Sequence, residues 1–513
     1  MGFWKWAEAE PDRLAVVDPE GREISFGELA ARSNRVLHGL RSLGVQVGDS
    51  IAVLMPNGTA VLDFFLAASQ GGLYLTTINF RLMPDEISYV LADSGAGVFV
   101  AHERVAAVAR AAVERASVPL ERRFAVGDVP GFRSLEDLTR GQPATRPEDR
   151  RPGDRMQYTS GTTGRPKGIR RPLDDADVDV VAARPLTGPV FGLKAGQGVH
   201  LVCGPMYHSA PLSVGAVALH HGIPLVLMDK WSPEETLRLI ERYRVTTTHM
   251  VPTMFHRLLA LPEETKSRYD LSSLETVVHG AAPVSRDVKR RMIEWWGPIL
   301  YEYFGSTEVA GCGVSSKDWL EHPGTVGKPW PGIELEIVDS DGNPCPPGVP
   351  GRVYMSHVQR LPFEYYKSPE KTAASRRGNF VTVGDIGYVD EEGWLYPCDR
   401  EANMIISGGV NIYPAEVEAV LLEHPAVADV AVFGIPNEDW GEEVKAVVEP
   451  RAGHETSSDL ERELIEFTRS RIAHYKCPRS VDFREHLPRD DNGKLYKRRI
   501  RDEYWEGRAS RLV

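Results

Sequence analysis

YTSGTTGRPKG, residues 158–168, is the stretch from which the fold class of this chain is best deduced. Hydroxyl side chains, glycine amides and one lysine are concentrated here beside a predicted strand. Such a loop can wrap the oxygens of a polyphosphate, because backbone N–H groups and a lysine ammonium both attract anions. The Gly-Lys-Ser/Thr spacing of a P-loop is absent, so P-loop NTPase chemistry is not predicted. Taken alone, the stretch is also consistent with a linker.

Length and composition indicate a large soluble protein. The chain has 513 residues, and because cores beyond about 250–300 residues usually divide, we expect at least two domains. With 42% hydrophobic and 26% charged residues, its composition is that of an ordinary globular protein. The formal net charge of -12 argues against a nucleic-acid partner, which would require a basic field. Anionic ligands must therefore be bound by local groups of cations.

The cysteines and the N-terminus predict a cytoplasmic protein. The five cysteines are scattered without a CxxC pair, and such a set is typical of a reducing compartment. The opening residues MGFWKWAEAE lack the apolar segment of a signal peptide. We therefore expect a cytoplasmic location.

Residues 195–228 contain no Asp, Glu, Lys or Arg and are long enough to span a bilayer. Three prolines would break a spanning helix and four histidines would be costly in lipid: Pro205, Pro211, Pro224, His200, His208, His220 and His221. A buried strand–helix–strand unit is therefore favoured over an integral membrane segment.

Short aliphatic runs alternate with amphipathic stretches, which predicts an α/β fold with parallel-rich sheets. The expected strands are 51–55, 98–101, 199–203, 225–228, 246–250 and 276–279. After about Gly332 the chain is richer in strands and Gly/Pro turns, which indicates an added β-rich subdomain. A small α/β pattern follows Asp399. We therefore predict a multi-layer α/β protein with a large N-terminal domain, 1–399, and a small C-terminal domain, 400–513.

Residues 158–168 resemble, nearly letter for letter, the phosphate loop of the adenylate-forming superfamily of acyl-CoA synthetases, peptide-synthetase adenylation domains and luciferases. The resemblance continues in order through YHSAP (207–211), GAAP (280–283), YEYFGSTE (301–308), GDIGY (384–388), Asp399-Arg400 and NGK (492–494). It covers nearly the whole chain. It implies an AMP-forming, ATP-dependent acid–thiol ligase that makes an acyl-adenylate, with a mobile C-terminal lid domain.

The resemblance assigns three residues to the reacting phosphate. It implies that Thr307 binds the α-phosphate, that Glu308 holds Mg²⁺, and that Lys494 neutralises the charge developing between carboxylate and α-phosphate. Individually, Glu308 is also consistent with a solvated helix cap and Lys494 with a solvated lysine.

The rest of the nucleotide site is likewise implied by the resemblance. Asp385 would accept hydrogen bonds from both ribose hydroxyls, Arg400 would support ribose and phosphate, and Phe304 would stack on adenine against residues 280–282. The other residues assigned to ATP are Thr159, Ser160, Gly161, Thr162, Thr163, Gly164, Lys167, Gly280, Ala281, Ala282 and Tyr303.

Three histidines are candidates for the acyl site. The resemblance implies that His208 lies at the gate between the nucleotide and acyl sites, with His279 and His249 on the pocket wall. For His249, the sequence is equally consistent with a buried core residue whose ring is hydrogen-bonded and has no role in binding the acid. The uncharged 195–228 region favours a hydrophobic acid. Residues 248–255 resemble members that act on fatty or bulky alicyclic acids, including steroid and terpenoid side chains.

Coenzyme A is the expected acyl acceptor. The segment around Gly408 and Gly409 resembles the family loop that lines the pantetheine tunnel, and glycines permit close backbone approach. Residues after Asp399 complete one small domain without a carrier domain, which favours a free thiol. A luciferase-type oxidation is a weaker alternative. The expected partners are a small-molecule acid and CoA, with a homodimer as the default assembly.

Ala402 departs from the family pattern. Members generally carry Asp or Lys two residues after the boundary arginine, where the C-terminal domain rotates, and here that hinge position is Ala402. Alanine allows rotation but removes a charge contact that biases one orientation. Two alternatives to a complete ligase therefore stay open. One is an enzyme that mainly converts a supplied acyl-adenylate to a thioester, and the other is a noncatalytic nucleotide or acyl-adenylate binding module.

Overall fold

The computed structural model describes all 513 residues except 117, 160–165, 185–187, 189, 358–361, 408–409, 438, 490–494 and 507–513. The chain forms two compact units. Unit 1 comprises Met1–Met250, Ala260–Val278 and Gln359–Ala374, and unit 2 comprises Val251–Leu259, His279–Val358 and Ser375–Val513. The predicted domain boundary at 399/400 lies within unit 2 and stays a prediction.

The first sheet of unit 1 is parallel, with the strand order β7-β6-β5-β3-β4-β8. Strand β3 (Ser50–Leu54) is buried along its whole length, as expected for an apolar strand covered on both faces. Helices α4 (Pro84–Ser94) and α5 (Ala106–Ala116) pack on β3 and β5 through a shared hydrophobic cluster. The remaining elements are β4 (Tyr74–Thr77), β5 (Ala96–His102), β6 (Arg123–Val126), β7 (Arg133–Ser134), β8 (Asp154–Arg155), α2 (Phe26–Ser42), α3 (Thr59–Gly71) and α6 (Leu135–Thr139).

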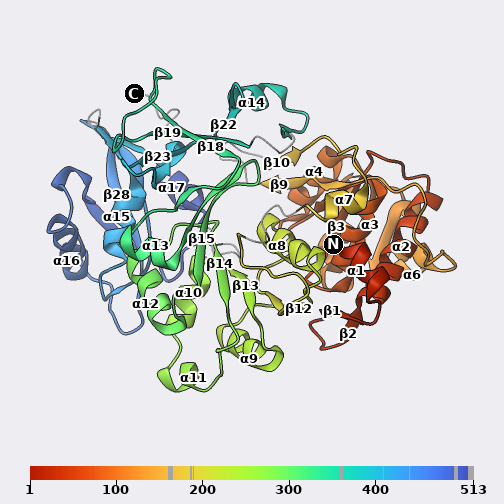
Figure 1. The fold of residues 1–513 in the computed structure, drawn as a ribbon. Helices are drawn as coiled ribbons and strands as arrows, with labels where there is room; N and C mark the ends of the chain where they lie inside the picture. The colour runs from red at the N-terminus through yellow and green to blue at the C-terminus, as the bar shows by residue number, and fades with distance from the viewer. Residues whose placement is uncertain are drawn as a thin grey trace. The chain divides into compact units, whose positions relative to one another are not determined.

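A second group of strands in unit 1 has the order β13-β11-β12-β1-β2. Strands β13, β12, β1 and β2 are labelled in Figure 1. The strands of this group are parallel except for the last pair. They are β1 (Leu14–Val17), β2 (Glu23–Ser25), β11 (His200–Val202), β12 (Leu225–Leu227) and β13 (Thr247–Met250), accompanied by α1 (Phe3–Ala9), α7 (Val178–Ala182), α8 (Ser209–His220), α9 (Pro233–Tyr243) and α11 (Glu263–Ser267).

The uncharged stretch 195–228 therefore forms a buried strand–helix–strand unit, β11-α8-β12, as predicted. Helix α8 buries residues around most of its circumference, which explains why it carries no charge. Across the described part of the chain, no helix has the length and apolarity needed to cross a membrane.

A small antiparallel sheet in unit 1 carries the ends of the predicted phosphate loop. Its order is β20-β10-β9, with β9 (Gln157–Thr159), β10 (Lys167–Arg170) and β20 (Glu364–Tyr365), followed by α14 (Pro369–Ala374). Strand β20 comes from a segment almost two hundred residues later in the sequence. The chain passes from unit 1 to unit 2 along β14 (Thr276–His279).

Unit 2 begins with antiparallel strands and the β-rich region that the sequence predicts. Strands β15 (Leu300–Gly305), β16 (Ala310–Ser315) and β17 (Lys328–Pro329) pair in order. The β-rich region comprises β18 (Ile333–Val338), β19 (Gly351–His357), β21 (Arg376–Arg377), β22 (Phe380–Val381), β23 (Asp385–Val389) and β24 (Leu395–Arg400). The helices here are α10 (Pro252–Leu259), α12 (Arg286–Trp296) and α13 (Ser316–Glu321).

The C-terminal part of unit 2 is a small α/β layer. Long strands β27 (Val427–Asn437) and β28 (Gly441–Pro450) form a hairpin, to which β25 (Ile405–Ser407), β26 (Val410–Ile412) and β29 (Ser480–Phe483) add. Helices α15 (Pro414–Leu421) and α16 (Ser458–Arg469) share its apolar core, and α17 (Lys497–Tyr504) packs on β27. The predicted α/β class with parallel-rich sheets and a β-rich region is confirmed.

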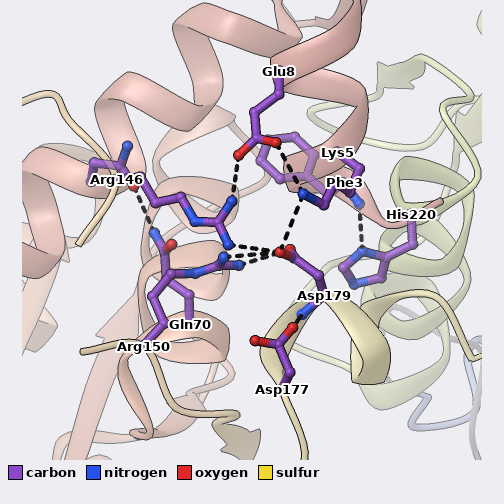
Figure 2. A network of polar contacts seen from close by, with 10 residues as sticks. Phe3, Lys5, Glu8, Gln70, Arg146, Arg150, Asp177, Asp179 and His220 are labelled. Atoms are coloured by element: carbon purple, nitrogen blue, oxygen red, sulfur yellow. Dashed lines mark hydrogen bonds and ion pairs between the residues drawn. The ribbon is translucent and has the colours of Figure 1, made fainter. Parts of the chain in front are cut away.

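A polar network ties the N-terminal helix α1 to the rest of unit 1 (Figure 2). The Asp179 carboxylate at the start of α7 accepts bonds from Arg146 at 2.7 Å and Arg150 at 3.0 Å. Arg146 also pairs with Glu8 of α1, and Arg150 lies over the ring of Trp4 at 4.7 Å. The cations of the 146–150 segment thus join α1 to α7.

His220 binds the start of helix α1 to helix α8. It ends α8, and its Nδ1 accepts a hydrogen bond from the Phe3 amide at 3.3 Å, which requires a neutral ring at that nitrogen (Figure 2). Burial lowers the pKa of His220 to about 4, with neighbouring His221 adding to the shift. The helix that begins after His208 is therefore fastened at its far end by the N-terminus of the chain.

We predict that the hydrogen bond between the Phe3 amide and His220 weakens in acid. Since the folded-state pKa of His220 lies below the ordinary value, its contribution is present above about pH 6.5 and is lost as pH falls toward 4, by about 3 kcal/mol at most. Urea unfolding at pH 7 and pH 4.5 should show a smaller acid loss for His220→Gln, whose amide oxygen can accept the same bond, than for the wild type. Exposed His454→Gln is the control. Equal losses in His220→Gln and wild type would contradict the prediction.

Candidate functional site

The two ends of the predicted phosphate loop lie side by side. Thr159 ends β9 and Lys167 begins β10, and the two are directly paired in the antiparallel register. Residues 160–164, which the sequence assigns to the phosphates, lie outside the described residues. The Lys167 ammonium lies 4.7 Å from the centre of the Tyr365 ring, which is buried on the neighbouring strand. The structure therefore supplies a held cation at the mouth of the loop.

The segment that carries His208 is attached to the same sheet. Gln157 of β9 donates to the Tyr207 carbonyl at 2.9 Å, and Thr77 of β4 donates to the same oxygen at 3.1 Å. His208 is the N-cap of α8, with its ring 4.4 Å from that of Tyr207. The predicted gate histidine thus follows directly a residue that is hydrogen-bonded to the base of the phosphate loop.

Asn57 organises the carboxyl ends of two parallel strands in unit 1. Its amide donates to the carbonyls of Gly204 at 3.0 Å and Met228 at 2.9 Å, and its oxygen accepts from the Met206 amide at 2.7 Å. Ligands of open parallel sheets bind beyond the carboxyl ends of strands. Asn57 was not among the predicted residues, and no local pattern around it signals this role.

The histidines inside unit 1 are neutral. His249 of β13 is almost fully buried, and burial lowers its pKa to about 4. His200 of β11 is also buried, and burial, with the nearby His249, lowers its pKa to about 3. The His200 ring is hydrogen-bonded to Thr247 at 2.9 Å. The interior beside α8 therefore holds uncharged imidazoles at neutral pH.

In unit 2 the predicted adenine turn is strained and tightly packed. Ala281 adopts φ of 68°, a left-handed value that an L-residue reaches only when its surroundings impose it. A Cβ at Gly280 would lie 2.7 Å from the Tyr303 ring, so only glycine fits there. Phe304 instead packs partly on the cluster around Val309 and Cys312. The structure thus places Tyr303 directly beside Gly280, and the stacking of Phe304 on adenine stays a prediction.

Asp385 and Arg400 face each other across a hairpin in unit 2. They are paired in register on β23 and β24, and Arg400 Nε donates to Asp385 Oδ1 at 3.1 Å. Burial raises the pKa of Asp385, Arg400 opposes the rise, and the charges of Asp399 and Glu308 add to it. Glu308 is therefore close enough for its charge to act on Asp385. Thr307 and Glu308 follow β15 in the turn before β16.

The residues after Arg400 connect β24 to the C-terminal layer. Ala402 lies in a short 3-10 helix, Glu401–Asn403, whose Glu401 pairs with Arg352 at 2.6 Å. The Asp399 carboxylate accepts from the Ala415 amide at 2.8 Å, at the start of α15. Among the other predicted residues, Gly408, Gly409 and Lys494 lie outside the described residues. The hinge role of Ala402 stays a prediction.

Unit 2 thus groups the predicted ribose, metal and adenine residues, whereas unit 1 carries Thr159, Lys167, His208 and His249. Besides Asn57, the sequence did not identify Gln157 or the buried pair Lys289 and Glu302. Gln157 immediately precedes the phosphate motif, and Glu302 lies within the 301–308 motif. Their positions at or in these motifs are the only sequence signal that could have identified them as site residues.

Comparison with known proteins identifies the family. The family model for AMP-binding enzymes matches residues 3–361, and the model for the C-terminal domain of AMP-binding enzymes matches residues 416–494. The chain is 35% identical to a feruloyl-CoA synthase of Amycolatopsis sp, over 98% of this chain and 99% of that one. It is 30% identical to the fatty acid–[acyl-carrier-protein] ligase ScoC of Streptomyces coeruleorubidus, over 99% and 96%. The solved anthranilate CoA ligase AuaEII, in complex with anthranoyl-AMP, superposes with a TM-score of 0.87 at 26% identity, covering 98% and 96%.

The chain belongs to the AMP-binding enzyme family, and the predicted membership of the adenylate-forming superfamily is confirmed. It is an AMP-forming, ATP-dependent acid–CoA ligase that uses ATP, Mg²⁺ and coenzyme A.

The described residues fit these groups. Among them, no cluster of three or more potential metal-ligating side chains occurs, and Mg²⁺ that bridges a nucleotide needs only one or two carboxylates besides phosphates and water. Glu308 satisfies that requirement. The absence of a side chain at Gly280 lets the Tyr303 ring pack directly on the turn, which brings an aromatic face to the predicted adenine site.

We predict that Asp385→Asn weakens ATP binding. Losing a charged acceptor should raise the KM for ATP by about 10- to 100-fold, since hydrogen bonds to charged groups contribute about 1.5–3 kcal/mol. Initial rates against ATP concentration would measure it. Asp390→Asn is the matched control, because Asp390 caps the far turn of the same hairpin, accepting from the Trp394 amide at 2.9 Å. An unchanged KM in Asp385→Asn would show that this carboxylate does not bind the nucleotide.

Proposed function

We propose that the enzyme activates a hydrophobic carboxylic acid, fatty or bulky and alicyclic, and transfers its acyl group to coenzyme A. The observation that carries the proposal for the acid is the apolar character of the β11-α8-β12 segment itself, although Arg155 donates to Ser213 Oγ of α8 at 2.5 Å. The whole stretch 195–228 lacks charged side chains, and buried His200 and His249 are held neutral. An apolar acyl group is compatible with such a lining, whereas an ammonium would remain unpaired.

The relatives do not agree on one class of acid: ferulic and fatty acids have a large apolar body, whereas 2-succinylbenzoate carries a second carboxylate. Their names include a feruloyl-CoA synthase, a fatty acid ligase and 2-succinylbenzoate–CoA ligases. Ferulic acid is an aromatic propenoic acid, so it shares an apolar body with the fatty and alicyclic acids. Aryl propenoic acids therefore belong in the substrate test beside the fatty, steroid and terpenoid acids.

The proposal assigns both half-reactions to this chain. ATP supplies an AMP leaving group that converts a poor electrophile into an activated acyl group. Lys167, Thr307 and Arg400 would hold phosphate and ribose oxygens, and Glu308 would hold Mg²⁺. Lys494 would neutralise charge at the reacting carboxylate, with His208 at the gate to the acyl group. These roles rest on the motif positions given above.

The alternative in which the chain mainly forms thioesters from a supplied acyl-adenylate is motivated by Ala402. A noncatalytic binding module is the other alternative. Acid-dependent exchange of pyrophosphate into ATP separates all three: fast exchange supports the complete ligase, slow exchange with rapid acyl-AMP consumption by CoA supports the first alternative, and AMP binding without either supports the second.

We infer that CoA contacts an exposed aromatic residue near the predicted pantetheine segment. Trp440 is 47% exposed, and the Arg479 guanidinium lies 5.3 Å from the centre of its ring. Gly441, the next residue, pairs with Ser407 at the end of β25, and Ser407 immediately precedes the predicted pantetheine glycines in the sequence. An exposed indole with an adjacent cation suits a purine and its phosphates. This surface favours CoA over a carrier-protein thiol.

A cytoplasmic location, a homodimer and a domain boundary at 399/400 complete the proposal. The location is supported by the cysteines, all five of which are free. Sedimentation of the purified protein tests the dimer.

We predict a strong preference for large apolar acids. Each buried methylene contributes about 0.8 kcal/mol, so kcat/KM for a medium-chain, aryl propenoic or alicyclic acid should exceed that for acetate by about 100-fold or more. AMP release and acyl-CoA formation, followed with ATP, Mg²⁺, CoA and an acid panel, would measure this. A preference for acetate or for an amino acid would contradict the proposed acid class.

We predict that Trp440→Ala raises the KM for CoA about tenfold, because stacking of a base on an aromatic ring contributes about 1–3 kcal/mol. The KM for ATP in pyrophosphate exchange should not change. Trp440→Phe should restore most of the CoA affinity, and Leu320→Ala, another exposed apolar residue, is the control. If Trp440→Ala leaves the KM for CoA unchanged, this surface does not bind the nucleotide part of CoA.

A further inference from the structure

A buried ion pair lies behind the predicted adenine turn of unit 2. Lys289 donates to Glu302 at 2.5 Å, and their side chains are 0% and 6% exposed. They belong to helix α12 and strand β15, both labelled in Figure 1. The Lys289 ammonium also lies 4.8 Å from the centre of the Trp319 ring, itself buried. Burial raises the pKa of Glu302 and lowers that of Lys289, and each partner's charge opposes the other's shift. Both ions are thus removed from water.

Stability alone is a poor explanation for such a pair. Desolvating two ions costs about as much as their attraction returns, and well-packed apolar residues in the same place are often as stable or more stable. A buried pair does, however, have strict geometric demands, because each charge must meet its partner. Lys289 and Glu302 therefore constrain where α12 and β15 lie relative to each other.

Glu302 also reaches the residue that precedes the turn. Its Oε2 lies 4.0 Å from Nε2 of His279, the last residue of β14. His279 is fully buried, with its ring 5.1 Å from that of Phe255. The same carboxylate therefore lies next to the lysine of one element and the imidazole at the end of another.

The residues that follow on each strand are also in contact. Tyr303, after Glu302, packs on Gly280, after His279. Successive side chains of a strand point to opposite faces. The Glu302 carboxylate and the Tyr303 ring therefore contact the start of the turn, at His279 and Gly280, from opposite faces of β15. Ala281, the next residue, adopts the left-handed φ of 68°. An alanine keeps this conformation only where neighbouring contacts outweigh its cost.

We propose that Lys289 and Glu302 are positioning residues for the nucleotide turn 280–282, and that the buried pair keeps Ala281 in its strained conformation. The inference rests on the proposed adenine role of this turn. The pair touches neither ATP nor the acid. Its loss should weaken ATP binding and leave the KM for CoA unchanged.

The test replaces both ions with apolar residues so that folding is retained. In Lys289→Leu/Glu302→Leu we expect a thermal midpoint no lower than that of the wild type, a KM for ATP raised about tenfold and a matching loss of AMP affinity by calorimetry. Glu302→Gln, which keeps the shape and removes the charge, is the second variant and should shift the KM for ATP in the same direction. The exposed pair Lys194 and Glu275, 2.6 Å apart, provides the control Lys194→Met/Glu275→Gln.

A suppressor separates positioning from a purely structural role. Ala281→Gly removes the cost of the left-handed conformation, so adding it to Glu302→Gln should recover part of the ATP affinity. If the wild type binds ATP and the folded double-leucine and Glu302→Gln variants bind ATP and AMP with unchanged affinity, the inference is overturned. Failure of the wild type to bind ATP would overturn the proposed nucleotide site itself, so the two failures are distinguishable.

Discussion

Repulsion between anions is the physical constraint on which this structure depends. ATP and a carboxylate are both negative, and the chain itself carries a net charge of -12, so attraction must be supplied locally. Each unit presents a cation held by its neighbours. In unit 1 Lys167 lies over the Tyr365 ring, and in unit 2 Arg400 is held by Asp385. In the proposed nucleotide site both side chains would already be oriented before phosphate binds, which would reduce the entropy lost on binding.

Helix α8 has the opposite character, since none of its own residues is charged, although Arg155 donates to its Ser213 Oγ at 2.5 Å. Because α8 has no charged residues, ion pairs of its own cannot fix its ends, and other contacts must do so. Before its first residue, the Tyr207 carbonyl accepts from Gln157 and Thr77, and at the other end His220 accepts from the Phe3 amide of the N-terminal helix. The network around Asp179 then anchors that helix to unit 1, with the Asp179 and Arg150 side chains only 13% and 6% exposed (Figure 2).

Much of the fold was predictable because its signals are local. The apolar runs at 51–55 and 98–101 became β3 and β5, and the uncharged stretch became β11-α8-β12. The candidate site was predictable only where residues lie in a motif. Asn57 joins carbonyls at Gly204 and Met228, and Lys289 meets Glu302 on another element. Such pairings depend on packing, so no spacing along the chain reveals them.

The sequence by itself determined the family and the chemistry, because residues 158–168, 301–308 and 384–388 each form a motif of consecutive residues that is recognisable without knowledge of the fold. Tertiary structure decided which neighbours hold those groups. It placed Tyr303 rather than Phe304 against Gly280, brought Tyr365 to Lys167 from almost two hundred residues away, and imposed the left-handed conformation on Ala281. The physical reason is that side-chain chemistry is a property of each residue, whereas strain and orientation arise only when distant elements pack together.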